Sequence, residues 1–190
     1  FHPDGTMPVL ASQTVRTWFE KKHKPLNQGI GRKVYLFCDE FTNYNDVEIG
    51  QTSVALLERL GYEVVMPHHV ESGRSYLSKG FVKEAQKLAI ENVNLLKDLI
   101  TAETPLIGIE PSAILSFRDE YVDLVPENLR MAARKLGENA LLIEEFIAQE
   151  IENKHISKSL FTTEKRKIRL HGHCHQKALS NMVAPKRMLS

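Results

Sequence analysis

Short runs of apolar residues recur along the chain, bounded by glycine, proline or charged residues. Continuous apolar runs of this length are typical of strands that are buried on both faces of a parallel sheet. They predict strands at 34–38, 62–66, 106–109 and 168–171. The last of these follows a basic linker.

Between these runs, apolar residues repeat every three or four positions, as they do on one face of an amphipathic helix. We expect Asp46, Ser78 and Ser112 to cap helices, because their side chains can accept hydrogen bonds from the free N–H groups of a first turn. Gly61 and Pro126 are expected to end helices. The predicted helices span 9–22, 47–60, 78–99, 112–124 and 129–151, the last with a break at Gly137 if it forms two helices.

Strands that alternate with long helices predict a mostly parallel sheet, because parallel neighbours need crossover connections. Helices would cover both faces of that sheet. The expected fold class is therefore α/β, with three layers, four strands and a Rossmann-like arrangement. A chain of 190 residues fits one such domain, which can bury about 70% of its unfolded surface.

Charge and composition narrow the classes of partner. The 25 Lys and Arg residues nearly balance the 24 Asp and Glu residues, so no long-range field would draw the chain to nucleic acid or an anionic membrane. No apolar run approaches the roughly 20 residues of a membrane-spanning helix. Gly29-Ile30-Gly31 precedes a strand instead of following one, which excludes a dinucleotide-binding loop there.

The two cysteines, Cys38 and Cys174, are too few for the disulfide framework of a small secreted protein. No secretory signal pattern opens the chain. We therefore expect a cytoplasmic location. Because the chain begins at Phe1 and not at Met, it is interpreted as a piece of a longer polypeptide.

Polar residues of chemical interest follow each predicted strand. Open parallel sheets bind ligands beyond the carboxyl ends of their strands, so these residues would share one edge. Arg74 lies in a turn at this edge, where it could meet an anion or be a surface cation. The other residues are Cys38, Asp39 and Glu40 after the first strand, His68, His69 and Glu71 after the second, Glu110 after the third, and the His-Gly-His-Cys-His segment 171–175 after the fourth.

Imidazole, thiolate and carboxylate groups are the donors that zinc and iron sites use. His173, Cys174 and His175 are therefore candidate metal ligands, and the alternative is a histidine-rich loop at a domain junction. Cys38 could be a nucleophile, and the alternative is a small buried apolar residue at a strand end. For Glu110 the alternative is an acidic residue that is favourable at a helix start.

Four segments carry a further resemblance: 36–44, 71–80, 108–121 and 171–179. Together they resemble the cysteine-rich CCG domain. This domain occurs in iron–sulfur subunits of glycolate oxidase and anaerobic glycerol-3-phosphate dehydrogenase, and in heterodisulfide reductase. It also forms the C-terminal part of large FAD-linked oxidase fusions, which the chain resembles most closely.

The chain departs from this domain at its thiolates. Complete repeats carry a Cys-Cys-Gly triplet after the second strand and another cysteine after the third. Here the triplet position has Glu71-Ser72-Gly73, and Ala113 stands at the later position. The resemblance implies three parts: 1–32 as an N-terminal helix and linker, 33–157 as a degenerate first repeat, and 158–190 as a linker and the start of a truncated second repeat.

The resemblance implies a fragment of an FAD-linked, iron–sulfur oxidoreductase for a 2-hydroxy acid such as glycolate or lactate. The fragment would be a scaffold of the electron-transfer domain, with no catalytic residue and no cofactor of its own. FAD would lie outside it. The implied partners are the FAD-binding portion of the same polypeptide and an acceptor such as a quinone or a disulfide, with the whole protein peripheral to the inner membrane.

The resemblance also implies roles for particular side chains. Cys174 would ligate an iron–sulfur cluster or zinc in the complete protein, supported by its two neighbouring histidines. The residues expected to face the cofactor are Glu71, Arg74 and Glu110, and the expected metal ligands are Cys174, His173 and His175.

Two other functions remain open. A mononuclear zinc or iron hydrolase could be built from His69, Glu110, His173 and Cys174, with an open position that activates water. Alternatively, the chain could be a non-catalytic domain that docks a dehydrogenase onto its electron-transfer partner.

Overall fold

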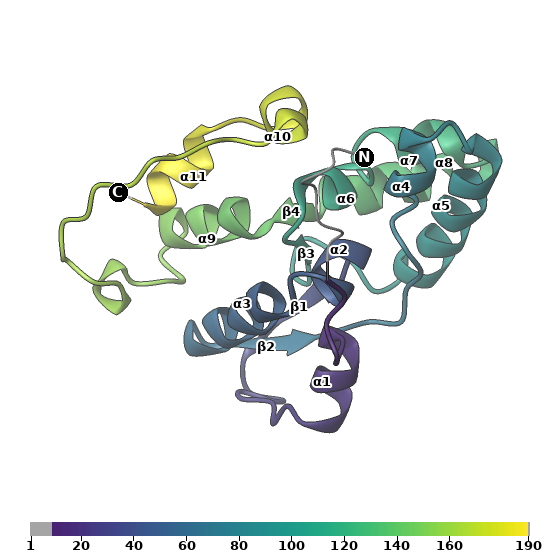
Figure 1. The fold of residues 1–190 in the computed structure, drawn as a ribbon. Coiled ribbons are helices and arrows are strands. Elements are labelled where there is room, and N and C mark those ends of the chain that lie inside the picture. Colours follow the sequence, from purple (N-terminus) through teal and green to yellow (C-terminus); the bar gives the residue numbers. More distant parts are fainter. Residues whose placement is uncertain (1–8, 190) are drawn as a thin grey trace, which may run out of the picture.

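A single sheet of four parallel strands forms the centre of the fold, as a computed structural model shows for residues 9–189 (Figure 1). The predicted α/β class is confirmed. The first eight residues of the predicted N-terminal part and the last residue of the predicted C-terminal part lie outside the described residues. The strands are β1 (Arg32–Phe37), β2 (Tyr62–Val65), β3 (Leu106–Gly108) and β4 (Ala140–Leu142), in the order β2-β1-β3-β4.

Successive residues of the two central strands point to opposite faces of the sheet, and both faces are covered by helices. Phe37 and Leu106 belong to one buried apolar cluster, whereas Leu36 and Ile107 belong to another. This double burial explains the continuous apolar runs in the sequence. The first cluster is completed by α5 (Val82–Leu96), α6 (Pro111–Leu115), α7 (Glu120–Leu124) and α8 (Glu127–Glu138), and the second by α3 (Val47–Arg59) and α9 (Ile143–Glu152), with α1 (Val15–Lys21) beside them.

The prediction of a strand at 168–171 is wrong. Residues 162–173 have no regular secondary structure, and the side chains of Ile168 and Leu170 are 56% and 45% exposed. The fourth strand is instead β4, between two helices that sequence periodicity merges into one segment at 129–151. β4 is as short as β3, but helix residues lie almost directly on both sides of it, whereas Pro105 marks the start of β3 in the sequence.

Two predicted helix starts are also wrong. Ser78 ends the short helix α4 (Arg74–Ser78), and Gly80, with a φ of +79°, separates α4 from α5. Ser112 lies inside α6, whose N-cap is Glu110. The segment expected to form one helix from 112 to 124 is divided into α6 and α7. Asp46 does precede α3, but its side chain makes no capping hydrogen bond.

Close packing of α6 against β3 depends on Gly108. A Cβ atom at this position would lie 2.3 Å from Cβ of Ile114. The absence of a side chain therefore lets the first turn of α6 approach the carboxyl end of β3, and this approach fixes the position of Glu110.

The C-terminal segment returns along α9 toward α6 (Figure 1). Its helices are α10 (Cys174–Leu179), which contacts α6, and α11 (Val183–Met188), which contacts α9. Leu179 and Met188 pack against the first and second apolar clusters, respectively. Among the described residues, no helix combines the length and the apolar character that crossing a bilayer requires. The remaining short elements are α2 (Glu40–Tyr44) and a 3-10 turn at Lys158–Leu160.

Candidate metal centre

The two central strands of the sheet lead into connections that run to opposite sides, β1 to β2 and β3 to β4. In open parallel sheets, ligands bind at the carboxyl ends of strands that diverge in this way. Asp39 follows β1 and caps α2, and Glu110 follows β3 and caps α6. Burial raises the pKa of Asp39, and the negative charges of Glu110 and Glu40 add to this effect. An acidic edge therefore marks the point of divergence.

His173, Cys174 and His175 form the one group of three potential ligands that lie together among residues 9–189. A ligand atom from each lies within 4.8 Å of the other two. Cys174 Sγ is 3.9 Å from His173 Nδ1 and 3.7 Å from His175 Nδ1. The start of α10 produces this arrangement, because His173 is its N-cap and its Nδ1 accepts a hydrogen bond of 3.2 Å from the backbone N–H of His175.

The spacing of these donors fits a single metal ion, for which His173 Nδ1 would have to release the N–H of His175. In a tetrahedral zinc site, Zn–S and Zn–N bonds of about 2.3 and 2.0 Å place sulfur and nitrogen roughly 3.5 Å apart. Both Sγ–Nδ1 distances are close to this separation, and Cys174 is exposed. An iron–sulfur cluster usually needs several thiolates. Cys38 is buried and does not belong to the group, so the described residues alone do not fit a cluster.

The helix that carries these ligands is held to α9 by polar contacts. Gln176 donates a hydrogen bond of 2.6 Å to Glu144, and Ser180 donates one to Glu145. Arg118 pairs with the same Glu145 carboxylate through both terminal nitrogens, at 3.1 and 2.5 Å. Burial would raise the pKa of Glu145, but the bonds from Arg118 and Ser180 hold it below its ordinary value. Glu145 therefore stays ionised and anchors α10.

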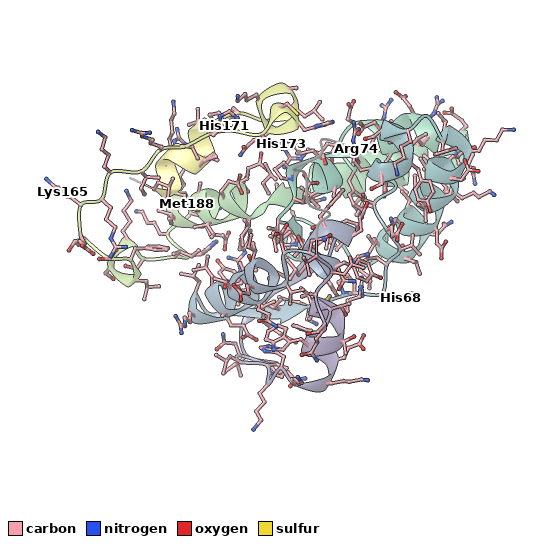
Figure 2. All side chains as sticks on the ribbon, viewed as in Figure 1. His68, Arg74, Lys165, His171, His173 and Met188 are labelled. Atoms are coloured by element: carbon pink, nitrogen blue, oxygen red, sulfur yellow. The ribbon has the colours of Figure 1, made fainter. Side chains whose placement is uncertain are left out.

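The structure places the three residues predicted to face a cofactor in different surroundings. Glu110 Oε1 lies 3.9 Å from His173 Nε2, which brings Glu110 to the candidate metal ligands. Arg74 forms an ion pair with Glu120. Glu71 is exposed. Arg74 and His173 both lie along the upper side of the molecule in Figure 2.

Sequence reasoning missed the groups that hold the loop at 70–73. Ser72 donates from its hydroxyl and its backbone N–H to Glu40, at 2.7 and 3.0 Å. Asn92 bonds to Val70 N–H and to the Glu71 carbonyl, and Tyr121 donates to the Ser72 carbonyl. The available signal was Asn92 on the apolar face of the helix predicted at 78–99, since a buried amide needs several polar partners.

His69 and Cys38 have structural surroundings instead of catalytic ones. His69 Nε2 accepts a bond from Cys38 N–H, and its Nδ1 contacts the Val70 carbonyl at 2.8 Å. Burial, with the nearby Arg16 charge, lowers the pKa of His69 to about 3. Both ring nitrogens are used, and His69 is not in the ligand group, so the set of four residues expected for a hydrolase does not assemble.

The two cysteines are expected to differ sharply in reactivity. Burial raises the pKa of Cys38 to about 12, despite the opposing charge of Arg16, whereas Cys174 is exposed. Because the thiolate is the reactive form, alkylation of the folded protein at pH 8 should modify one thiol, at Cys174. Mass spectrometry of peptides checks the site, and a Cys174→Ser variant should react only after unfolding. Rapid modification of Cys38 in the folded chain would contradict this assignment.

The chain is similar to segments of oxidoreductases that act on 2-hydroxy acids. It is 28% identical over 126 residues to D-2-hydroxyglutarate dehydrogenase of Escherichia coli, covering 66% of this chain and 12% of that protein. The corresponding Pantoea ananatis enzyme is 25% identical over 162 residues, which are 79% of this chain and 15% of the enzyme.

A further relative is lactate utilization protein A of Bacillus subtilis, 28% identical over 162 residues. The match covers 83% of this chain and 64% of that protein. The chain thus spans only a small part of the dehydrogenases that it matches and less than two thirds of the Bacillus protein. No family model and no solved structure matches it.

Proposed function

We propose that this chain is part of an FAD-linked oxidoreductase for 2-hydroxy acids, in which it serves as the scaffold of an electron-transfer domain and presents a metal-ligating segment. The observation that carries the proposal is the exposed Cys174 thiol between two imidazoles, in a chain similar to D-2-hydroxyglutarate dehydrogenases. Lactate utilization protein A, matched over most of this chain, supports the same substrate class.

The division of roles follows from the donors that the chain offers. His173, Cys174 and His175 would hold one zinc or iron ion, or Cys174 would contribute one thiolate to a cluster whose other thiolates lie outside the described residues. An iron–sulfur centre would supply one-electron transfer there. The FAD and the substrate would bind to the dehydrogenase portion, and a quinone or a disulfide would accept the electrons.

The ligand assignment can be tested on this chain with cobalt(II), which substitutes for zinc and reports on thiolate ligation. We expect one cobalt ion per chain and a sulfur-to-metal charge-transfer band in the near ultraviolet. Cys174→Ser should remove the band, whereas Cys38→Ser should leave it unchanged, because Cys38 is buried outside the ligand group. A wild-type chain that binds no cobalt would overturn the assignment.

The role in electron transfer needs the complete, anaerobically purified oxidoreductase. With D-2-hydroxyglutarate or lactate as substrate, Cys174→Ser should leave reduction of the FAD by substrate intact and slow reduction of the acceptor by at least about 100-fold, a free-energy difference of about 2.7 kcal/mol. Stopped-flow absorbance separates the two half-reactions. Equal acceptor reduction in the wild type and the variant would exclude Cys174 from the electron path, and no FAD reduction with either acid would exclude the substrate class.

A further inference from the structure

Glu110 is held in one orientation by the helix that it caps. Its Oε2 atom accepts hydrogen bonds from Ala113 N–H at 2.6 Å and from the Ser112 hydroxyl at 2.7 Å. Pro111 occupies the first turn of α6, and Gly108 allows that turn to lie close against β3. The direction of the other oxygen, Oε1, is thereby set before any ligand arrives.

That oxygen faces the imidazole of His173. Glu110 Oε1 lies 3.9 Å from His173 Nε2, and the two side chains are 22% and 39% exposed. The opposite nitrogen, Nδ1, accepts the N–H of His175 and is therefore unprotonated. A neutral imidazole carries one proton, so Nε2 bears it, at 3.9 Å from Glu110 Oε1, a separation longer than a hydrogen bond.

A metal ion needs the same Nδ1 lone pair that now accepts the His175 N–H, because Nδ1 is the nitrogen near Cys174 Sγ. A histidine that ligates through one nitrogen usually donates the N–H of its other nitrogen to a carboxylate or carbonyl, which fixes the ring and strengthens it as a ligand. Glu110 is outside the group of three ligand atoms, but it stands where such a partner is required.

We infer that Glu110 is the positioning residue of the metal centre: its Oε1 accepts the Nε2 proton of His173 and holds Nδ1 toward the ion bound by Cys174. This inference rests on the ligand assignment made above. Glu110 would then have two roles. One carboxylate oxygen caps the start of α6, and the other orients His173 at the start of α10.

The test is the affinity of the whole chain for cobalt(II) and, by competition, for zinc. Glu110→Gln should weaken binding by about 10- to 100-fold. The amide oxygen can still cap α6, but the amide NH₂ group then faces the Nε2 proton, which it cannot accept. Ser112→Ala is the matched control, because it removes a bond to Oε2 of Glu110 and leaves Oε1 beside His173. The affinity of this variant for the metal should stay within about twofold of wild type.

A second variant separates positioning from capping. Aspartate is a good N-cap but is one methylene shorter, so Glu110→Asp should keep the melting temperature and still lose metal affinity. In the wild type loaded with zinc, nitrogen-15 NMR should show a slowly exchanging Nε2 proton on His173, absent in Glu110→Gln. Wild-type binding with undiminished affinity in both Glu110 variants would overturn the inference alone, whereas no binding by wild type would overturn the ligand assignment with it.

Discussion

Replacing Arg118 with leucine is expected to lower the free energy of unfolding by about 3–5 kcal/mol, the usual cost of leaving a buried charge without its partner. The Glu145 side chain is 10% exposed and pairs with both terminal nitrogens of Arg118. Arg118 also donates a hydrogen bond of 2.8 Å to the Ala140 carbonyl, at the start of β4. Urea unfolding at pH 7 measures the loss.

The loss should depend on pH in a defined direction. In the wild type the pKa of Glu145 is below its ordinary value, so the ionised carboxylate stabilises the fold above about pH 4.5, and this contribution disappears as the pH falls through the folded-state pKa. In Arg118→Leu, burial without the cation should raise that pKa, so protonation relieves the penalty. The stability difference should therefore shrink between pH 7 and pH 3.

A double variant, Arg118→Leu with Glu145→Leu, is the control for this pair. Replacing both partners by apolar residues of similar size usually restores most of the stability. If the single and double variants were equally unstable at pH 7, the loss would come from packing or from the Ala140 contact instead of the unpaired charge. The double variant should still loosen the end of α10, because it also removes the bond from Ser180 to Glu145.

Asn92→Leu is expected to destabilise the protein by about 2–4 kcal/mol, since each polar group left unpaired inside a protein costs about 1–3 kcal/mol. Asn92 is fully buried and bonds at 2.9–3.0 Å to Val70 N–H, the Glu71 carbonyl and the Tyr121 hydroxyl. Leucine fills a similar volume but satisfies none of these groups. Thermal or urea unfolding measures the change.

Asn94→Leu is the matched control, on the exposed side of the same helix, and should change stability by no more than about 0.5 kcal/mol. Hydrogen exchange should locate the effect. Amide protons at 70–73 should exchange faster in Asn92→Leu, with β1 and β3 changed only by the global loss. Uniformly faster exchange over the whole chain, with no excess at 70–73, would show that Asn92 does not hold this loop in particular.

The sequence predicted what depends on local pattern. Three of the four strands and the fold class follow from apolar runs, and the grouping of His173, Cys174 and His175 follows from their adjacency in the chain, whereas the start of α10 at these residues was not predicted. The run at 168–171 has the composition of a strand but pairs with no strand among the described residues. β4 was missed because it lies directly between α8 and α9, so its apolar residues continue the periodicity of the two helices.

Contacts between segments far apart in the chain could not be predicted from the sequence. The approach of Glu110 to His173 and the pairing of Arg118 with Glu145 depend on how the helices cross the sheet. Glu110 illustrates the limit: its interpretation as an acidic helix-start residue is confirmed, and its second neighbour appears only in three dimensions.

The burial of Cys38 also has a consequence for covalent assembly. The chain has two cysteines. Cys38 is buried, and its thiol contacts Asn43 of α2. A disulfide formed in air by the folded chain must therefore join Cys174 of two copies. In such a crosslinked dimer the only thiol of the candidate centre is oxidised. Storage without reductant would therefore abolish metal binding while leaving the fold intact.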